Sequence, residues 1–293
     1  MSGNWRRCMW LLWSGALLPA LLGMARADEL SVFVSILPQK YFVERVGGKQ
    51  VAVSVMVGPG QSPETYEPTP NQLARLAGAR VYFEIGIEFE EVWMKNIAAA
   101  NPGMRVIDMR RGIPARELER SEGARAPAER QGLADPHVWT SPPLVKIMAA
   151  NIRDTLSQLD PAHRAAYGAN YEVFAADLDR LDHDIRVLLK NVSTRNFMVF
   201  HPAWGYFADS YGLQQIPIEA GGKEPGARTL AQVIDIGRRE RIKVIFVQAQ
   251  FSRRAAETIA QAIGARVVAA DPLAEDYINN LRRVARQFAE AMQ

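Results

Sequence analysis

The hydrophobic and polar positions of this chain follow two alternating periods from residue 30 onward. Short runs of apolar or β-branched residues are typical of buried strands, and the segments between them repeat apolar residues at helical spacing. The predicted strands are 30–34, 51–57, 80–83, 105–107, 197–200, 213–218, 244–247 and 266–270. The predicted helices are 39–46, 71–77, 89–100, 204–211, 230–240, 254–263 and 277–291. This alternation predicts an α/β fold built on parallel sheets.

The most regular predicted element is a long amphipathic helix in the middle of the chain. Asp160 is predicted as its N-cap and Pro161 as its first residue. Apolar residues then recur at steps of four and three on one face: Tyr167, Tyr171, Phe174, Leu178, Leu181, Ile185 and Leu188. A helix over 161–190 would be about 45 Å long. That length exceeds the need of one crossover, so we expect a spine that runs along two lobes.

The long helix divides the chain into three parts. We expect an N-terminal α/β lobe over 28–159, the linking spine helix over 160–190 and a C-terminal α/β lobe over 191–293. Inside the first lobe, segment 109–134 interrupts the alternation and is rich in Arg, Glu, Ala and Gly. We predict a solvated loop there, with its charges in water.

The first 27 residues have the pattern of a secretory signal peptide. Arg6 and Arg7 form a basic start, an apolar run follows over 8–22, and a small-x-small cleavage pattern ends at Ala27. The apolar run is shorter than the about 20 residues that a membrane span needs. We therefore expect cleavage after Ala27 and export to the periplasm.

Removal of the signal peptide changes the charge and the chemistry of the chain. The segment holds three arginines and no acidic residue, so the mature 266 residues carry 32 basic and 32 acidic side chains. That balance gives no support to nucleic-acid binding. The only cysteine, Cys8, also lies in the segment, without a lipid-attachment context. The mature chain therefore has no thiolate ligand, and any metal site must use His, Asp and Glu.

Two of the four histidines stand in similar short settings. Each of His137 and His201 has a proline beside it and a tryptophan two or three residues further on. Proline fixes the local backbone and an aromatic ring can wall off a pocket, which suits an imidazole held in place for a metal ion. The other two, His163 and His183, lie off the apolar stripe of the long helix and are predicted to be surface residues.

Candidate carboxylate ligands fall just beyond predicted strands. His201 directly follows strand 197–200, Asp271 directly follows strand 266–270, and Glu64 lies a short loop beyond strand 51–57. In parallel α/β sheets, ligands bind at the carboxyl ends of the strands. An Asp before Pro is by itself mostly a helix cap, but together with the paired histidine settings these residues favour a metal site between the lobes.

At these positions the sequence resembles the zinc and manganese substrate-binding proteins of bacterial ABC importers. The similar segments are the loop 58–70 around Glu64, Asp-Pro-His-Val-Trp around His137, Phe-His-Pro-Ala-Trp around His201, and Asp-Pro-Leu from Asp271. Their order and spacing match over essentially all of the mature chain. The resemblance implies two lobes joined by a spine helix, with a divalent metal captured in the inter-lobe cleft and delivered to an ABC permease. It implies Glu64, His137, His201 and Asp271 as the metal ligands.

The chain departs from the family pattern in two places. Glu64 stands where the family usually has His, and segment 109–134 lacks the histidines that zinc members often carry there. Two His with two carboxylates form a harder donor set than three His with one, which suits manganese and tolerates zinc. The segment around His201 looks zinc-like, so we expect zinc first and manganese second. A three-ligand site with Glu64 as an exposed loop carboxylate stays open.

The expected protein is a monomeric receptor and not an enzyme. A secreted metal-dependent hydrolase is the alternative, because a catalytic zinc site keeps an open position for water. No His-Glu-x-x-His pattern is present in the sequence. A metal-storage or adhesin role on the same scaffold stays open. The run 221–223, Gly-Gly-Lys, lacks the full phosphate-loop pattern and is predicted to be a surface turn.

Overall fold

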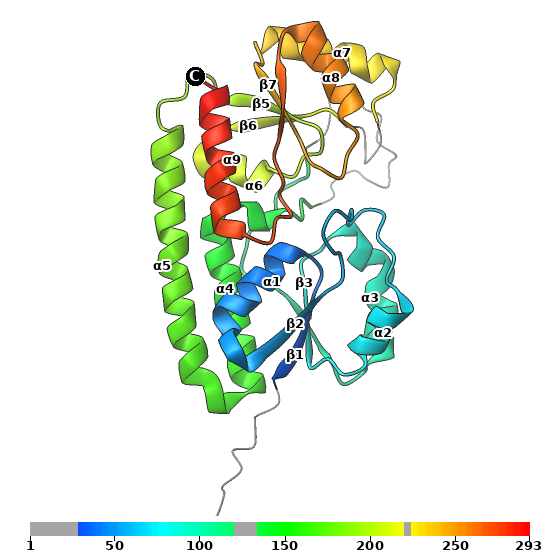
Figure 1. The fold of residues 1–293 in the computed structure, drawn as a ribbon, viewed down its shortest axis with the longest axis vertical. Coiled ribbons are helices and arrows are strands. Elements are labelled where there is room, and N and C mark those ends of the chain that lie inside the picture. Colours follow the sequence, from blue (N-terminus) through cyan, green and yellow to red (C-terminus); the bar gives the residue numbers. More distant parts are fainter. Residues whose placement is uncertain (1–28, 120–133, 220–223) are drawn as a thin grey trace, which may run out of the picture.

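A computed structural model of the protein describes residues 29–119, 134–219 and 224–293 and contains two α/β lobes (Figure 1). The predicted signal peptide lies outside these residues. Each lobe is built on a four-stranded sheet in which every pair of neighbours is parallel. The strands of the N-terminal lobe are β1 (Leu30–Val34), β2 (Val51–Val55), β3 (Val81–Glu84) and β4 (Arg105–Asp108). Those of the C-terminal lobe are β5 (Asn196–Val199), β6 (Gln214–Pro217), β7 (Val244–Val247) and β8 (Arg266–Ala269).

The two sheets have the same strand order. The first is β2-β1-β3-β4 and the second is β6-β5-β7-β8. In the first sheet Val32 pairs with Val53 on one side and Val81 on the other, and in the second Met198 pairs with Ile216 and Ile245. Each sheet therefore has a switch point, between β1 and β3 and between β5 and β7. Ligand sites in open α/β sheets form at such points, beyond the carboxyl ends of the strands.

Helices connect the strands of each lobe, and one further helix follows the last strand of the C-terminal lobe. Those of the N-terminal lobe are α1 (Leu37–Gly47), α2 (Pro70–Leu76) and α3 (Glu88–Ala100), with a 3₁₀ turn at Gly48–Gln50. Those of the C-terminal lobe are α6 (Gly205–Tyr211), α7 (Ala227–Arg239), α8 (Arg253–Ile263) and α9 (Tyr277–Ala291). Gly212 and Gly264 follow α6 and α8 in the left-handed conformation, at φ 64° and 71°, which glycine adopts without a Cβ clash.

One long helix was not predicted. α4 (Pro142–Leu159) begins with proline at its first turn and buries Val145, Met148, Ile152 and Leu156. These residues recur at steps of three and four, so the helical signal was present in the sequence. α4 packs against α5 and α1. Because it follows the His137 turn directly, it anchors that turn to the spine.

The spine helix begins later than predicted. α5 (Arg164–Leu189) follows a 3₁₀ turn at Pro161–His163, and the Asp160 carboxylate accepts a hydrogen bond from the Tyr167 hydroxyl at 2.7 Å instead of capping the backbone. The helix is therefore about 39 Å long rather than about 45 Å. Its apolar face ends on buried Leu189, whereas Leu188 is 37 % exposed. The predicted spine itself is confirmed, and α5 runs along both lobes beside α4 and α9 (Figure 1).

A single apolar core continues through both lobes on the side of the spine. It includes Phe42 of the N-terminal lobe, Phe174 of α5 and Phe246 and Phe288 of the C-terminal lobe. The rings of Phe246 and Phe288 stack at 4.0 Å. A second, smaller core lies on the other side of the C-terminal sheet, under α7 and α8. This shared core packs both lobes against the spine helix α5.

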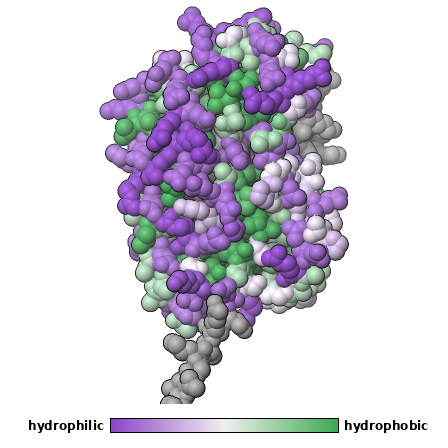
Figure 2. Space-filling model, viewed as in Figure 1, coloured by the Kyte–Doolittle hydropathy of each residue, from purple (hydrophilic) through white to green (hydrophobic). Residues whose placement is uncertain are grey.

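The outer surface is mainly polar. Hydrophilic side chains cover most of the left side of the molecule in Figure 2, where α5 lies in Figure 1. His183 on this helix is exposed as predicted, and half-buried His163 contacts Asp160 through Nδ1 at 2.6 Å. Among the residues that the structure describes, no helix is long and apolar enough to cross a membrane.

Candidate metal centre

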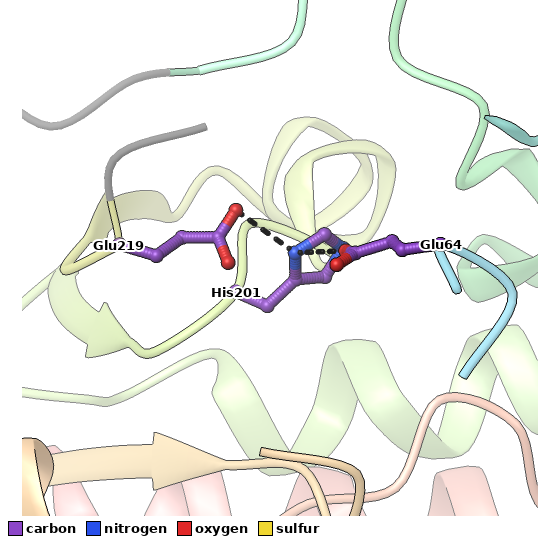
Figure 3. A group of neighbouring side chains, drawn as sticks. All are labelled: Glu64, His201 and Glu219. Atoms are coloured by element: carbon purple, nitrogen blue, oxygen red, sulfur yellow. Dashed lines mark hydrogen bonds and ion pairs between the residues drawn. The ribbon is translucent and has the colours of Figure 1, made fainter. Parts of the chain in front are cut away.

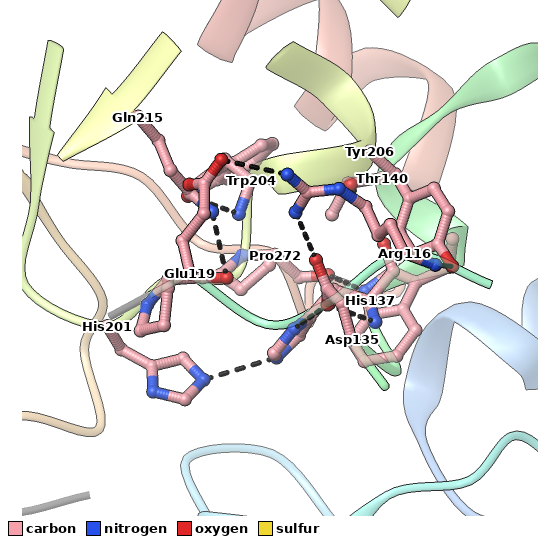
Figure 4. A network of polar contacts seen from close by, with 12 residues as sticks. Arg116, Glu119, Asp135, His137, Thr140, His201, Trp204, Tyr206, Gln215 and Pro272 are labelled. Atoms are coloured by element: carbon pink, nitrogen blue, oxygen red, sulfur yellow. Dashed lines mark hydrogen bonds and ion pairs between the residues drawn. The ribbon is translucent and has the colours of Figure 1, made fainter. Parts of the chain in front are cut away.

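His137 and His201 come from different lobes and meet between them. His201 follows β5 at the switch point of the C-terminal sheet, and its carbonyl accepts a hydrogen bond from Gln248 Nε2 at 2.9 Å. His137 precedes the 3₁₀ turn Val138–Thr140 that leads into α4. The two side chains are almost fully buried, and their Nε2 atoms lie 3.1 Å apart (Figure 4). The structure therefore brings together the two histidines that the sequence singled out.

Aromatic rings flank both imidazoles, but one of them is not the predicted tryptophan. Trp139 packs against His137 with ring centroids 5.1 Å apart. Trp204 instead lies in the core against Phe207 and Phe288. Phe251 takes the expected place and stacks on His201 at 5.0 Å. Its position in the loop after β7 could not be matched to His201 from the local sequence.

Asp135 fixes the orientation of His137. Its Oδ1 contacts His137 Nδ1 at 2.7 Å and accepts the backbone N–H of His137 at 2.9 Å, while its Oδ2 accepts from Arg116 at 2.7 Å. Burial works to raise the pKa of Asp135, but His137 and Arg116 outweigh it and lower that pKa. An ionised Asp135 carboxylate accepts a hydrogen bond from the protonated Nδ1 of His137, so the lone pair of the ring is left on Nε2. This is the usual carboxylate support of a metal-binding histidine.

Two carboxylates approach His201 from opposite lobes. Glu64 Oε1 lies 3.0 Å from His201 Nδ1, and Glu219 Oε1 lies 3.1 Å from the same atom (Figure 3). Burial works to lower the pKa of His201, but the hydrogen bond to Glu219 and the charges of Glu219 and Glu64 raise it overall. Within the described parts of the chain, Glu64, His201 and Glu219 form a group whose potential ligand atoms all lie within 4.8 Å of one another.

Glu219 was not among the predicted ligands. It directly follows the predicted strand 213–218, so the rule that selected His201 and Asp271 could have selected it as well. The observed strand β6 ends at Pro217, and Glu219 is held beside β5 by its backbone N–H, which donates to the Phe200 carbonyl at 3.0 Å. What the sequence could not show is that β6 and β5 are neighbours, which places Glu219 next to His201.

Asp271 lies beside this group rather than inside it. Its Oδ1 accepts the backbone N–H of Leu273 at 2.8 Å, as in a turn cap, and its side chain is partly exposed. Asp271 lines a neighbouring cavity of about 260 Å³. The next two residues, Pro272 and Leu273, line the cavity of the histidine pair, and the Pro272 carbonyl accepts from Trp139 Nε1 at 2.9 Å. The structure thus places Asp271 at the edge of the centre formed by the other three predicted residues.

The cavity at the histidine pair is small. Its volume is about 30 Å³, and Glu64, Glu88, His137, His201 and Gln248 are among the residues that line it. A space of this size holds a single ion or a water molecule. Buried nitrogen lone pairs beside carboxylates favour a small cation over an anion or an apolar ligand.

A buried carboxylate supports one wall of this cavity. Glu90 accepts the backbone N–H of Ile85 at 3.0 Å and also accepts from Gly86. Burial raises the pKa of Glu90 to about 7 despite these hydrogen bonds. The contacts fix the turn between β3 and α3, which carries the cavity residues Ile87 and Glu88.

Arg116 connects the two lobes behind His137. Its guanidinium donates to Asp135 at 2.7 Å and to Glu119 at 2.8 Å (Figure 4). It also donates to Asp209 of α6 at 2.9 Å. The group passes so close to Gly205 that a Cβ there would lie 1.6 Å from Nη1. The prediction of a wet loop over 109–134 is therefore wrong at Arg116, whose side chain is only 16 % exposed. Residues 120–133 lie outside the described structure.

Comparison with known proteins points to one family. The family described as zinc-uptake complex component A, periplasmic, matches residues 32–291. The high-affinity zinc uptake system protein ZnuA of Bacillus subtilis is 28 % identical over 249 residues, which covers 83 % of this chain and 78 % of that protein. A crystal structure of ZnuA is 44 % identical, with a TM-score of 0.84, and covers 91 % of this chain and 100 % of that one.

A more distant structure shares the fold. The manganese-bound form of a mutant periplasmic metal-binding protein from Candidatus Liberibacter asiaticus has a TM-score of 0.79 at 21 % identity, covering 90 % of this chain and 100 % of that one. At this identity the likeness concerns the fold alone. The family match spans nearly all of the described chain, and it agrees with the two parallel sheets and the spine helix. The chain belongs to the family of periplasmic zinc-uptake components of ABC importers.

Proposed function

We propose that the protein is a periplasmic receptor that captures one divalent transition metal ion and delivers it to the permease of an ABC importer, with zinc as the first candidate and manganese as the second. The observation that carries this proposal is the pair of buried imidazoles with Nε2 atoms 3.1 Å apart. Two nitrogens bound to one tetrahedral zinc at about 2.0–2.1 Å lie about 3.3 Å apart. The pair is therefore already close to the spacing that the ion requires.

The proposed ligands are Glu64, His137, His201 and Asp271. Glu64 and His137 belong to the N-terminal lobe, while His201 and Asp271 belong to the C-terminal lobe, so separation of the lobes would divide the donor set. Asp271 is proposed as the fourth ligand because its neighbours Pro272 and Leu273 line the same cavity. Two nitrogens with two carboxylates suit manganese and tolerate zinc, and zinc is proposed first because the segment around His201 is similar to that of zinc members.

Transport is favoured over hydrolysis by the size of the site. A cavity of about 30 Å³ matches a single ion in size. The family match supports a periplasmic location and a permease partner. We propose that the chain is exported by cleavage after Ala27 and acts as a monomer.

Metal titration of Glu64→Ala tests the proposed site. Wild-type protein stripped of metal is expected to bind one zinc ion per chain in competition with a chromophoric chelator. Glu64→Ala is expected to lose at least about tenfold in zinc affinity, since it removes an anionic oxygen donor. Glu67→Ala, an exposed carboxylate in the same loop, serves as the control and should leave the affinity unchanged. Equal affinity in wild type and Glu64→Ala would remove Glu64 from the site.

Zinc binding is also expected to weaken as the pH falls. A histidine must be neutral to bind a metal, and the raised pKa of His201 means that protons compete at a higher pH than for an ordinary histidine of about 6.5. Affinity should therefore be greatest above the raised pKa and fall about tenfold per pH unit below it. Competition titrations between pH 8 and pH 5 measure this change, with circular dichroism to confirm folding. Unchanged affinity at pH 5 would contradict ligation by His137 and His201.

A further inference from the structure

We infer that Glu219 is a positioning residue that holds the proton of His201 on Nδ1 and thereby keeps Nε2 as the metal-binding nitrogen. The consequence for affinity rests on the proposed function, but the proton position is a property of the metal-free protein. Glu219 Oε1 lies 3.1 Å from His201 Nδ1, and the Glu219 side chain is only 6 % exposed (Figure 3).

The surroundings of Nδ1 decide between the two neutral forms of His201. A neutral imidazole carries its proton on one nitrogen and a lone pair on the other. With the proton on Nε2, the Nδ1 lone pair would face carboxylate oxygens of Glu64 and Glu219 at 3.0 and 3.1 Å. Such a group has acceptors only and no hydrogen to share. With the proton on Nδ1, the ring donates to a carboxylate and the Nε2 lone pair faces the cavity.

The arrangement repeats that of His137. Asp135 contacts Nδ1 of His137 at 2.7 Å, and Glu219 contacts Nδ1 of His201 at 3.1 Å. Each carboxylate lies behind its ring, and the two Nε2 atoms face each other at 3.1 Å. With both protons on Nδ1, two lone pairs converge on one point, which a cation would occupy. A proton on either Nε2 would instead place a hydrogen bond across the metal position.

Glu219 suits this role better than Glu64 because it belongs to the same lobe as His201. The backbone N–H of Glu219 donates to Phe200, the residue before His201, at 3.0 Å. The preceding N–H, of Ile218, donates to Val199 at 2.9 Å. These bonds tie Glu219 to the strand that carries His201, whereas Glu64 reaches across from the N-terminal lobe. The position of Glu219 relative to the ring is therefore set within the C-terminal lobe, whereas that of Glu64 depends on how the two lobes meet.

Nitrogen NMR of the metal-free protein tests the inference directly. Protein labelled with ¹⁵N-histidine is measured at pH 8, and His201→Asn assigns the His201 signals. We expect the proton on Nδ1 in wild type and in Glu219→Gln, whose amide oxygen still accepts. Because Glu64 also lies at Nδ1, the decisive comparison is made in a Glu64→Ala background. There we expect the proton to stay on Nδ1, and to leave it in a substantial fraction of molecules once Glu219→Ala is added. Zinc affinity should fall about 10- to 100-fold in Glu219→Ala and less than about tenfold in Glu219→Gln. Glu224→Ala, an exposed glutamate nearby, is the matched control.

Three results would overturn the inference. The first is a proton on Nε2 of His201 in wild type. The second is an unchanged proton position when Glu219→Ala is added to Glu64→Ala. The third is an equal loss of zinc affinity in Glu219→Ala and Glu219→Gln, which would make Glu219 a metal ligand. If wild type bound no zinc, the proposed function would fail, while the proton position in the metal-free protein would still decide the role of Glu219. If Glu219→Ala does not fold, the wild-type and Glu219→Gln spectra decide it.

Discussion

Replacing either buried histidine by alanine is expected to lower zinc affinity on the order of 1000-fold, which is about 4 kcal/mol of binding free energy. His137 and His201 supply the two nitrogen donors of the proposed centre, and either variant leaves a single imidazole with carboxylates. The loss should exceed the about 10- to 100-fold caused by removing an outer partner such as Glu219. Competition titration against a tight zinc chelator at pH 8 measures the change.

His183→Ala is the matched control for both histidine variants. His183 lies on the exposed face of α5, so this variant should bind zinc as wild type does. Urea unfolding of the metal-free variants confirms that a loss of affinity reflects the site and not the fold. Zinc affinity within tenfold of wild type in both His137→Ala and His201→Ala would refute the proposed centre.

The relative losses of zinc and manganese affinity in the histidine and Glu64 variants should distinguish the two metals. Zinc is bound well by imidazole, while manganese prefers carboxylate and carbonyl oxygens. His201→Ala should therefore weaken zinc more than manganese, and Glu64→Ala should do the reverse. Competition between the two metals in the same variants identifies which one the donor set favours.

The fold could be predicted from sequence because its signals are local. Strands such as β2 and β7 are short, mainly apolar runs. Phe174, Leu178, Leu181 and Ile185 define the buried face of α5 within the helix itself. The helical run begins at Pro161 as predicted, but its first turn is 3₁₀ and is not capped by the Asp160 carboxylate, which has two competing partners. It can cap the backbone or bind Tyr167, and the folded chain adopts the second arrangement. Such competition depends on side-chain positions that a pattern of residues does not contain.

Residues of the candidate site could be predicted only where the adjacent sequence carries a recognisable pattern. His137 and His201 stand beside prolines, and Glu64 lies in a loop with a recognisable pattern. Arg116 has no such mark, and Glu219 is marked only by its place directly after the predicted strand 213–218. Glu219 meets His201 because β6 pairs with β5, and Arg116 meets Asp209 because segment 110–119 packs on α6. Their roles come from tertiary contacts between distant segments, so only the structure reveals them.

Arg116→Met is expected to destabilise the metal-free protein by about 3 kcal/mol, since breaking a buried charge pair costs about 3–5 kcal/mol. Asp135 has a fully buried side chain, and Arg116 is its charged partner at 2.7 Å. Methionine keeps most of the aliphatic stem, so the change isolates the charge. Urea unfolding at pH 7 measures the loss. Arg253→Met, in an exposed pair with Glu257, is the control and should change stability by less than about 0.5 kcal/mol.

The free energy of unfolding should depend on pH because the pKa of Asp135 is lowered in the folded protein. Burial opposes the ionisation of Asp135, but His137 and Arg116 lower its pKa overall. The ion pair therefore stabilises the fold at pH values above the unfolded-state pKa of about 3.9. This stabilisation is lost as the pH falls through the lower pKa of the folded state. Without Arg116 that folded pKa rises, and the variant should lose stability at a higher pH than wild type. A loss that disappears in an Asp135→Asn background assigns the effect to this pair. A loss that persists there assigns it to the contacts of Arg116 with Asp209 and Glu119. Equal stability of Arg116→Met and wild type would contradict both assignments.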